Sequence, residues 1–139
     1  MNRTDLQSLA DIRIKEAIAL AGLPTPLPDG AYYLAGYAVE CALKACIAST
    51  YNQHDWPEKK FVDKCHTHSL LELVQLAGLR AAFDSDTNAN NALAQNWDVA
   101  KDWNEQSRYN RHSLQKAQKL ISAIADLSNG VLPWIKVHW

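Results

Sequence analysis

The sequence has few cysteines, few glycines, almost no net charge and no long hydrophobic run. Its three cysteines cannot all pair with one another, which favours a reducing compartment. Glycine is scarce and no segment alternates between apolar and polar residues, so no strand pattern competes with a helical one. Fourteen basic side chains against fifteen acidic ones leave a net charge of −1, which excludes a protein whose whole surface clamps nucleic acid by bulk electrostatics.

No segment is suited to a membrane or to secretion. The longest stretch nearly free of charge, residues 30–51, contains Glu40 and Lys44, both costly at the centre of a bilayer. Residues 1–22 are amphipathic and charged, and therefore do not read as a signal peptide. We expect a cytoplasmic protein with no membrane contact.

The composition predicts one folded domain over residues 1–139. The chain is 47% hydrophobic and 21% charged, whereas disordered chains have few apolar residues and a large net charge. A chain of this length can bury roughly two-thirds of its unfolded surface, which is enough for a hydrophobic core.

Helical periodicity predicts an all-α fold, an antiparallel up-and-down bundle of four or five helices. Thr4 and Gln7 have the spacing of a capping box at the start of the first helix. The remaining expected boundaries follow from apolar spacing and from turn residues. Helices are expected over residues 4–21, 29–50, 70–77, 89–103 and 111–128, with connections or turns over 51–67, 83–91 and 104–110 and a packed tail over 131–139. The third helix either stops at Gly78 or carries on as another turn over residues 79–83.

The second expected helix is apolar nearly all round. Asp29 is a suitable N-cap, and alanines and Gly36 recur along the segment. An all-round apolar helix is a buried one, and small side chains let neighbouring backbones approach closely. This segment is therefore expected to be the central helix of the bundle, or one that also faces a second subunit.

Glu40 and Lys44 are the charged residues of that apolar helix. They are four positions apart, so their side chains can meet, and glutamate preceding lysine is the favourable order. A buried charge needs a partner or water. The pair is either a structural ion pair that fixes helix register or includes a carboxylate lining a polar cleft.

Cys65, His66 and His68 are metal-ligating residue types close together in the sequence. The other histidines show no ligand spacing with this trio, and Cys41 and Cys46 point about 140° apart on a helix. His68 and Ser69 also stand where the next helix should be capped. We expect no metal site and no cofactor.

Aromatic side chains admit two interpretations. They can form a platform on which bases stack, or they can be core and tail anchors. The residues concerned are Trp97, Trp103, Trp134, Trp139 and Tyr109.

Residues 101–119 carry a local excess of three positive charges, with five basic side chains against two acidic ones. Arginine offers a planar fork that suits phosphate, and histidine exchanges protons near neutral pH. The last long helix is expected to begin here, and its free backbone N–H groups would add affinity for anions. The segment is either a phosphate-binding surface or a solvated helix start.

Three segments together resemble the HEPN domain family (higher eukaryotes and prokaryotes nucleotide-binding), in particular a bacterial single-domain subgroup. Residues 31–45, AYYLAGYAVECALKA, resemble the family's signature helix, and residues 68–73, HSLLEL, resemble the start of its next helix. Trp103 with Arg108 and Tyr109 resembles a Trp…Arg-Tyr feature of that subgroup. The resemblance spans about residues 30–134.

The resemblance implies a helical bundle that is commonly a homodimer. Many members are metal-independent endoribonucleases of toxin–antitoxin, defence or RNA-processing systems, and others accompany a minimal nucleotidyltransferase or bind ligands without catalysis. The family's catalytic signature is an arginine, about four to six residues, and then a histidine. This chain places three residues between Arg108 and His112, and no other histidine has an arginine at the family spacing.

Two main functions are consistent with these observations. The first is a binding module that holds a nucleotide or RNA phosphate with Arg108, Tyr109, Arg111 and Lys116, beside a nucleotidyltransferase-type partner. The second is an endoribonuclease in which His112 moves a proton at the ribose 2′-hydroxyl. Arg108, on the same helical face if residues 108–112 are helical, would offset the phosphorane charge, and Glu40 would orient either residue. A purely structural or interaction bundle is the third alternative.

We predict a homodimer that buries part of the second helix, because that helix has so little polar surface. Light scattering should give twice the mass of the chain at about tens of micromolar, an ordinary range for oligomer affinity. A strict monomer at that concentration would contradict the prediction.

Overall fold

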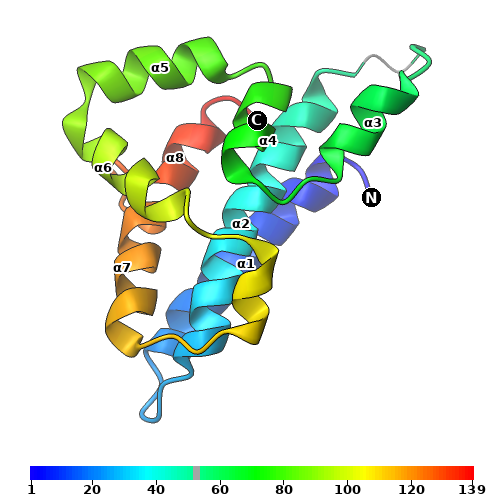
Figure 1. The fold of residues 1–139 in the computed structure, drawn as a ribbon. Coiled ribbons are helices and arrows are strands. Elements are labelled where there is room, and N and C mark those ends of the chain that lie inside the picture. Colours follow the sequence, from blue (N-terminus) through cyan, green and yellow to red (C-terminus); the bar gives the residue numbers. More distant parts are fainter. Residues whose placement is uncertain (52–53) are drawn as a thin grey trace.

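The computed structural model describes residues 1–51 and 54–139, and every regular element in these residues is helical (Figure 1). Residues 52–53, part of the connection expected over 51–67, lie outside the described residues. None of the described helices is long and apolar enough to cross a membrane. The elements are α1 (Arg3–Ala21), α2 (Pro28–Ser49), α3 (Lys59–Cys65), α4 (Leu70–Leu76), α5 (Arg80–Ala89), α6 (Asn91–Ala100), the 3-10 helix η1 (Glu105–Tyr109), α7 (Leu114–Ala125) and α8 (Val131–Lys136).

Helix α1 runs alongside α2, with a different N-terminal cap from the expected one. The capping box is formed by Asn2 and Asp5, whose side chains each accept a hydrogen bond from the other's backbone N–H. The prediction of Thr4 and Gln7 was wrong because Asn2, two positions earlier, has Asp5 three positions on and forms the capping box instead. The helix ends at Gly22 as predicted.

Helix α2 begins one residue earlier than expected. Pro28 occupies its first turn and Leu27 precedes it, so Asp29 is not the N-cap that the sequence indicated. Proline suits this position because its missing N–H would have no partner in the first turn. Asp29 is thereby free to accept hydrogen bonds from residues that follow η1.

The prediction that α2 is the buried central helix is confirmed. It packs against α1, α4, α7, α8 and η1 of the same chain. Alanine methyls let these neighbours approach the helix closely, and the following positions are fully buried: Ala31, Ala35, Ala38, Ala42 and Ala45. Since the chain itself covers α2, its apolar surface no longer requires a second subunit, and the homodimer stays a prediction that depends on other surfaces.

The short helices differ most from expectation. Helices α3 and α8 lie in an expected connection and an expected tail, and α5 covers most of a segment expected to be polar and turn-like. Tertiary contacts explain α5: the Phe83 ring packs edge-on against Trp97 and Trp134, and the Trp134 indole N–H donates to Asp86 at 2.8 Å. These contacts stabilise a helix that intrinsic propensity alone does not favour.

The Trp103 indole packs against Gly36 of α2 and so positions η1 on that helix. The indole is 1% exposed, and a Cβ added at Gly36 would lie 2.1 Å from its ring. No side chain fits in that space, so the indole rests on the bare backbone of α2. Because η1 begins two residues after Trp103, this contact sets where residues 105–109 meet α2.

We predict that Gly36→Ala lowers the free energy of unfolding by about 2–3 kcal/mol, because the added methyl forces Trp103 out of an enclosed position. Denaturant titration followed by tryptophan fluorescence measures the change. Gly30→Ala is the matched control: it lies on the same helix, and its methyl would meet only the Leu20 Cδ1 atom at 3.3 Å. Equal effects of the two substitutions would contradict the role given to the Trp103 contact.

Candidate functional site

The first turns of α2 contact most of the basic residues singled out in the sequence. Arg111 Nη1 lies 3.4 Å from Asp29 Oδ2, and Lys116 Nζ lies 5.1 Å from the centroid of the Tyr32 ring. The Arg108 guanidinium lies within hydrogen-bonding reach of the Tyr33 hydroxyl. We call this region, made of Arg108, Tyr109, Arg111 and Lys116, the loop surface.

Arg108 and Tyr109 form an exposed cation–aromatic pair at the end of η1. The guanidinium carbon lies 4.9 Å from the Tyr109 ring centroid, and Tyr109 is 73% exposed. Hydrogen bonding to the Tyr109 hydroxyl, with a smaller contribution from Tyr33, raises the pKa of Arg108, so the guanidinium stays charged. An exposed charge beside an exposed ring can hold a phosphate and a base together.

His112 lies under this surface and is buried. Its ring stacks on Tyr32 with centroids 3.9 Å apart, and its Nε2–H donates to the Ser107 carbonyl at 3.1 Å. Its backbone N–H donates to Asp29. The Nδ1 atom is buried and has no hydrogen-bond partner among the described residues. These contacts hold the segment between η1 and α7 against the start of α2.

The condition under which Arg108 and His112 would share one helical face, a helix over residues 108–112, is not met. Helix η1 ends at Tyr109, Asn110 has an extended backbone, and α7 begins only at Leu114 after its cap Ser113. Ser113 captures the start of α7 by accepting from Lys116 N, which excludes residues 111–113 from the helix. Arg108 is consequently exposed while His112 is buried.

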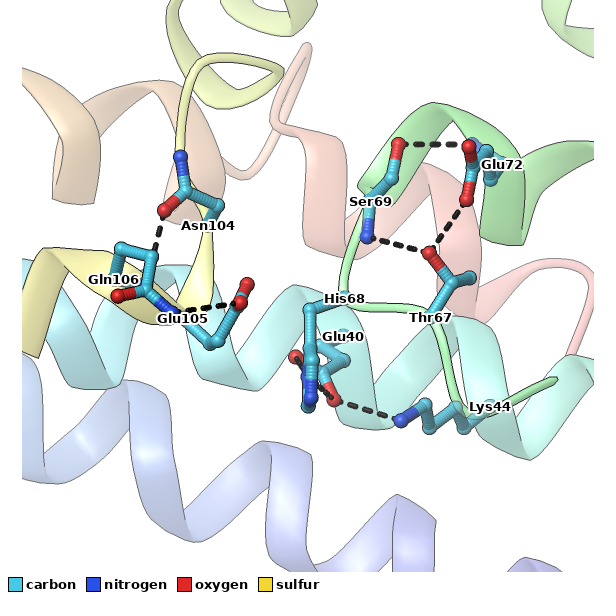
Figure 2. Close-up of polar contacts among 9 residues, drawn as sticks. All are labelled: Glu40, Lys44, Thr67, His68, Ser69, Glu72, Asn104, Glu105 and Gln106. Carbon is cyan, nitrogen blue, oxygen red and sulfur yellow. Dashed lines mark hydrogen bonds and ion pairs between the residues drawn. The ribbon is translucent and has the colours of Figure 1, made fainter. Parts of the chain in front are cut away.

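Glu40 lies further along α2, about 12 Å from Tyr32 at the rise of an α-helix. It is 2% exposed, and Lys44 Nζ donates to it at 2.8 Å, which confirms the predicted ion pair. Its carboxylate oxygens also lie 2.9 and 3.0 Å from His68 Nδ1 (Figure 2). Its observed polar partners are thus Lys44 and His68, neither of which belongs to the loop surface.

The contact with His68 was missed in the sequence. Twenty-eight positions separate the two residues, and no local pattern links them. The one feature of the sequence that pointed to a second partner was the expected burial of Glu40, because a buried carboxylate needs more than one polar partner. His68 precedes α4, whose N-cap is Ser69, as the sequence indicated.

Glu40 also lines a cavity of about 560 Å³. It lies among α1, α2 and α3, and its walls include Lys44, Cys65 and His66. The two interpretations of Glu40 are therefore compatible, because one carboxylate both forms an ion pair and borders a hollow. Among the described residues, no three or more His, Cys, Asp or Glu side chains are grouped so as to hold a metal ion.

The tryptophans divide between core and surface. Trp97 and Trp103 are buried, which confirms their interpretation as core anchors, and Trp134 and Trp139 are partly buried. Tyr109 alone of the predicted platform is largely exposed. Trp56, which was not singled out, is 95% exposed.

Comparison with protein-family models, with curated proteins and with solved structures finds no match to this chain.

The cysteines should differ in reactivity. Burial raises the pKa of the Cys41 and Cys46 thiols to about 11, and Glu40 adds to the shift at Cys41. Burial also raises the pKa of Cys65, but this residue is partly exposed.

The thiolate is the reactive form, so iodoacetamide at about pH 8 should modify Cys65 first in the native protein. Peptide mass spectrometry measures the order, and the urea-unfolded chain, in which all three should react alike, is the control. Faster native modification of Cys41 or Cys46 would contradict this packing.

Proposed function

We propose that this chain is a HEPN-type helical bundle that binds the phosphate of a nucleotide or of RNA at the loop surface. The observation that carries the proposal is the placement of Arg108 beside Tyr109. The guanidinium contacts tyrosines, which do not neutralise its charge, and the neighbouring ring is exposed. An anion with an attached base matches both features.

The two arginines are suited to different parts of such a ligand. Arg108 has a guanidinium fork that can bind two phosphate oxygens, while Tyr109 offers a face for stacking. Arg111 has a side chain that is 98% exposed and only a long contact with Asp29, so it can turn toward a second phosphate. Lys116 adds a positive charge above Tyr32.

The wider setting of the proposal comes from the family resemblance. A cytoplasmic homodimer acting beside a nucleotidyltransferase-type protein, in a toxin–antitoxin or defence system, is the setting that the resemblance favours. The net charge of −1 favours a local contact over one spread across the whole surface, and residues 101–119 carry an excess of three positive charges.

We predict that Arg108→Ala weakens binding of a fluorescein-labelled single-stranded RNA oligonucleotide by about tenfold, since one charge-assisted contact contributes about 1.5 kcal/mol. Tyr109→Ala should cost about 1–3 kcal/mol through lost stacking. Fluorescence anisotropy at several salt concentrations measures both. The slope of log affinity against log salt should become shallower for Arg108→Ala only.

Arg80→Ala is the matched control for this experiment. Arg80 is also an exposed arginine whose guanidinium lies over an aromatic ring, Phe83, but it belongs to α5. Equal losses in the two variants would contradict the loop surface as the binding site. An unmodified protein that binds no RNA and no mononucleotide would favour the structural or interaction bundle.

A further inference from the structure

The cavity of about 560 Å³ beside Glu40 is separate from the loop surface. The start of α1, the C-terminal part of α2 and α3 surround it (Figure 1). None of the described residues that line it belongs to the loop surface. Protein interiors contain few voids larger than a water molecule, while pockets for small ligands measure about 300–1,000 Å³. The cavity therefore has the size of a ligand site.

Helix α3 stands away from α2 and leaves this space open. Among the helices it packs mainly against α4, and within α3 no residue is fully buried. The Phe61 ring meets Tyr51 edge-on, with ring centroids 5.4 Å apart, at the end of α2. These two rings separate α3 from the end of α2, while Val62 and Cys65 line the cavity.

One face of α2 supplies much of the cavity wall. The α2 residues concerned follow one another mostly at intervals of three or four positions, the spacing that places side chains on one face. They are Tyr37, Glu40, Cys41, Lys44, Ile47 and Ala48. Polar groups come first along this face and apolar ones follow, and Val62 adds apolar surface from α3. The wall that α2 provides is therefore polar at one end and apolar at the other.

The two charged side chains of that polar end are paired with each other. Lys44 Nζ donates to Glu40 at 2.8 Å, and His68 contacts the same carboxylate from the segment before α4 (Figure 2). Burial raises the pKa of the Tyr37 hydroxyl, and it raises the pKa of the Cys41 thiol to about 11, so both groups are uncharged near neutral pH. A ligand in the cavity therefore meets an ion pair rather than a free charge.

Lys44 retains hydrogen-bonding capacity beside the cavity. An ammonium group has three N–H donors, and among the described residues Glu40 is its hydrogen-bond acceptor. The Lys44 side chain is 24% exposed and lines the cavity. An acceptor on a ligand can bind this ammonium without separating it from Glu40. A carboxylate on the ligand would face the negative charge of Glu40, and an amine would face the positive charge of Lys44.

We propose that this cavity binds a small uncharged molecule with an apolar body and one hydrogen-bond-accepting end group, as in a medium-chain alcohol. The end group lies at Lys44, and the apolar body lies along Ile47, Ala48 and Val62. Burial of the apolar body drives binding, and the hydrogen bond sets the orientation. Binding here is independent of the loop surface, because the two sites share none of their described residues.

Three probes with the same hydrocarbon chain test the class of ligand. They are 1-octanol, octanoate and octylamine, which are neutral, negative and positive at about pH 7. A titration of the isotope-labelled protein, followed through the methyl signals of Ile47 and Val62, gives the affinity and the place of binding. 1-Octanol should bind at least about tenfold more tightly than either charged probe, because a charged end group loses water without gaining an unpaired opposite charge.

Ala48→Leu tests the cavity itself. The added carbon atoms fill space at the wall, so 1-octanol should bind about tenfold more weakly, the loss expected when about two of its methylene groups no longer fit. Ser49→Leu is the matched control, because Ser49 is the exposed neighbour on α2 and is not among the residues found to line the cavity. It should bind 1-octanol like the unmodified protein, and circular dichroism measures the folded fraction of both variants.

Cys65 gives a second readout, since it lines the cavity and is partly exposed. A bound ligand covers this side chain. Saturating 1-octanol should therefore slow the reaction of Cys65 with iodoacetamide in the native protein and leave the reaction of the urea-unfolded chain unchanged.

Three kinds of result would overturn the inference. Tighter binding of octanoate or octylamine would show that the preferred end group is charged. Equal affinities of Ala48→Leu and Ser49→Leu for 1-octanol would place its binding elsewhere. A lack of binding by all three probes, or a reaction of Cys65 that 1-octanol does not slow, would show that the cavity takes no such ligand. RNA binding at the loop surface is measured separately, and none of these results bears on it.

Discussion

The contact between the Trp103 indole and the bare backbone of α2 at Gly36 is the constraint on which the position of the loop surface depends. It is the point where the chain returns from α6 to the central helix. From there η1 runs along α2 and carries Glu105 toward His68 and Arg108 toward Tyr33. Together with the contacts of His112 to Tyr32 and Asp29, that close approach fixes the basic segment against α2.

The burial of Glu40 is energetically costly for the fold. Taking a carboxylate out of water costs several kcal/mol, and a well-packed apolar residue would often serve stability as well. Here Lys44 and His68 both contact the carboxylate, and both remain partly open to solvent.

Sequence reasoning succeeded where periodicity extends over several turns. It identified α1, α2 and α7 and the burial of α2, although it made α7 too long at both ends. The Glu40–Lys44 pair was predictable because it is four residues apart on one helix. The sequence offered a further helical turn over residues 79–83, but the helix over residues 84–89 was not predictable, because it depends on Phe83 packing against distant tryptophans.

The candidate site was predictable only in part. The charge excess over residues 101–119 pointed to Arg108 and Arg111, but nothing local showed that His112 would be buried under Tyr32. The pairing of His68 with Glu40 joins segments 28 residues apart and appears only when α4 packs on α2. Similarly, nothing in the sequence distinguishes Gly36 from the other small residues of α2. Its role depends on the Trp103 indole, which packs against it.

The most direct measurement is an NMR titration of the isotope-labelled protein with a single-stranded RNA oligonucleotide. The account predicts that the largest shifts occur over residues 105–116, including the Arg108 side-chain Nε–H. Shifts confined to α5 or α1, or none at RNA concentrations of about 1 mM, above the usual range of non-specific binding, would contradict it.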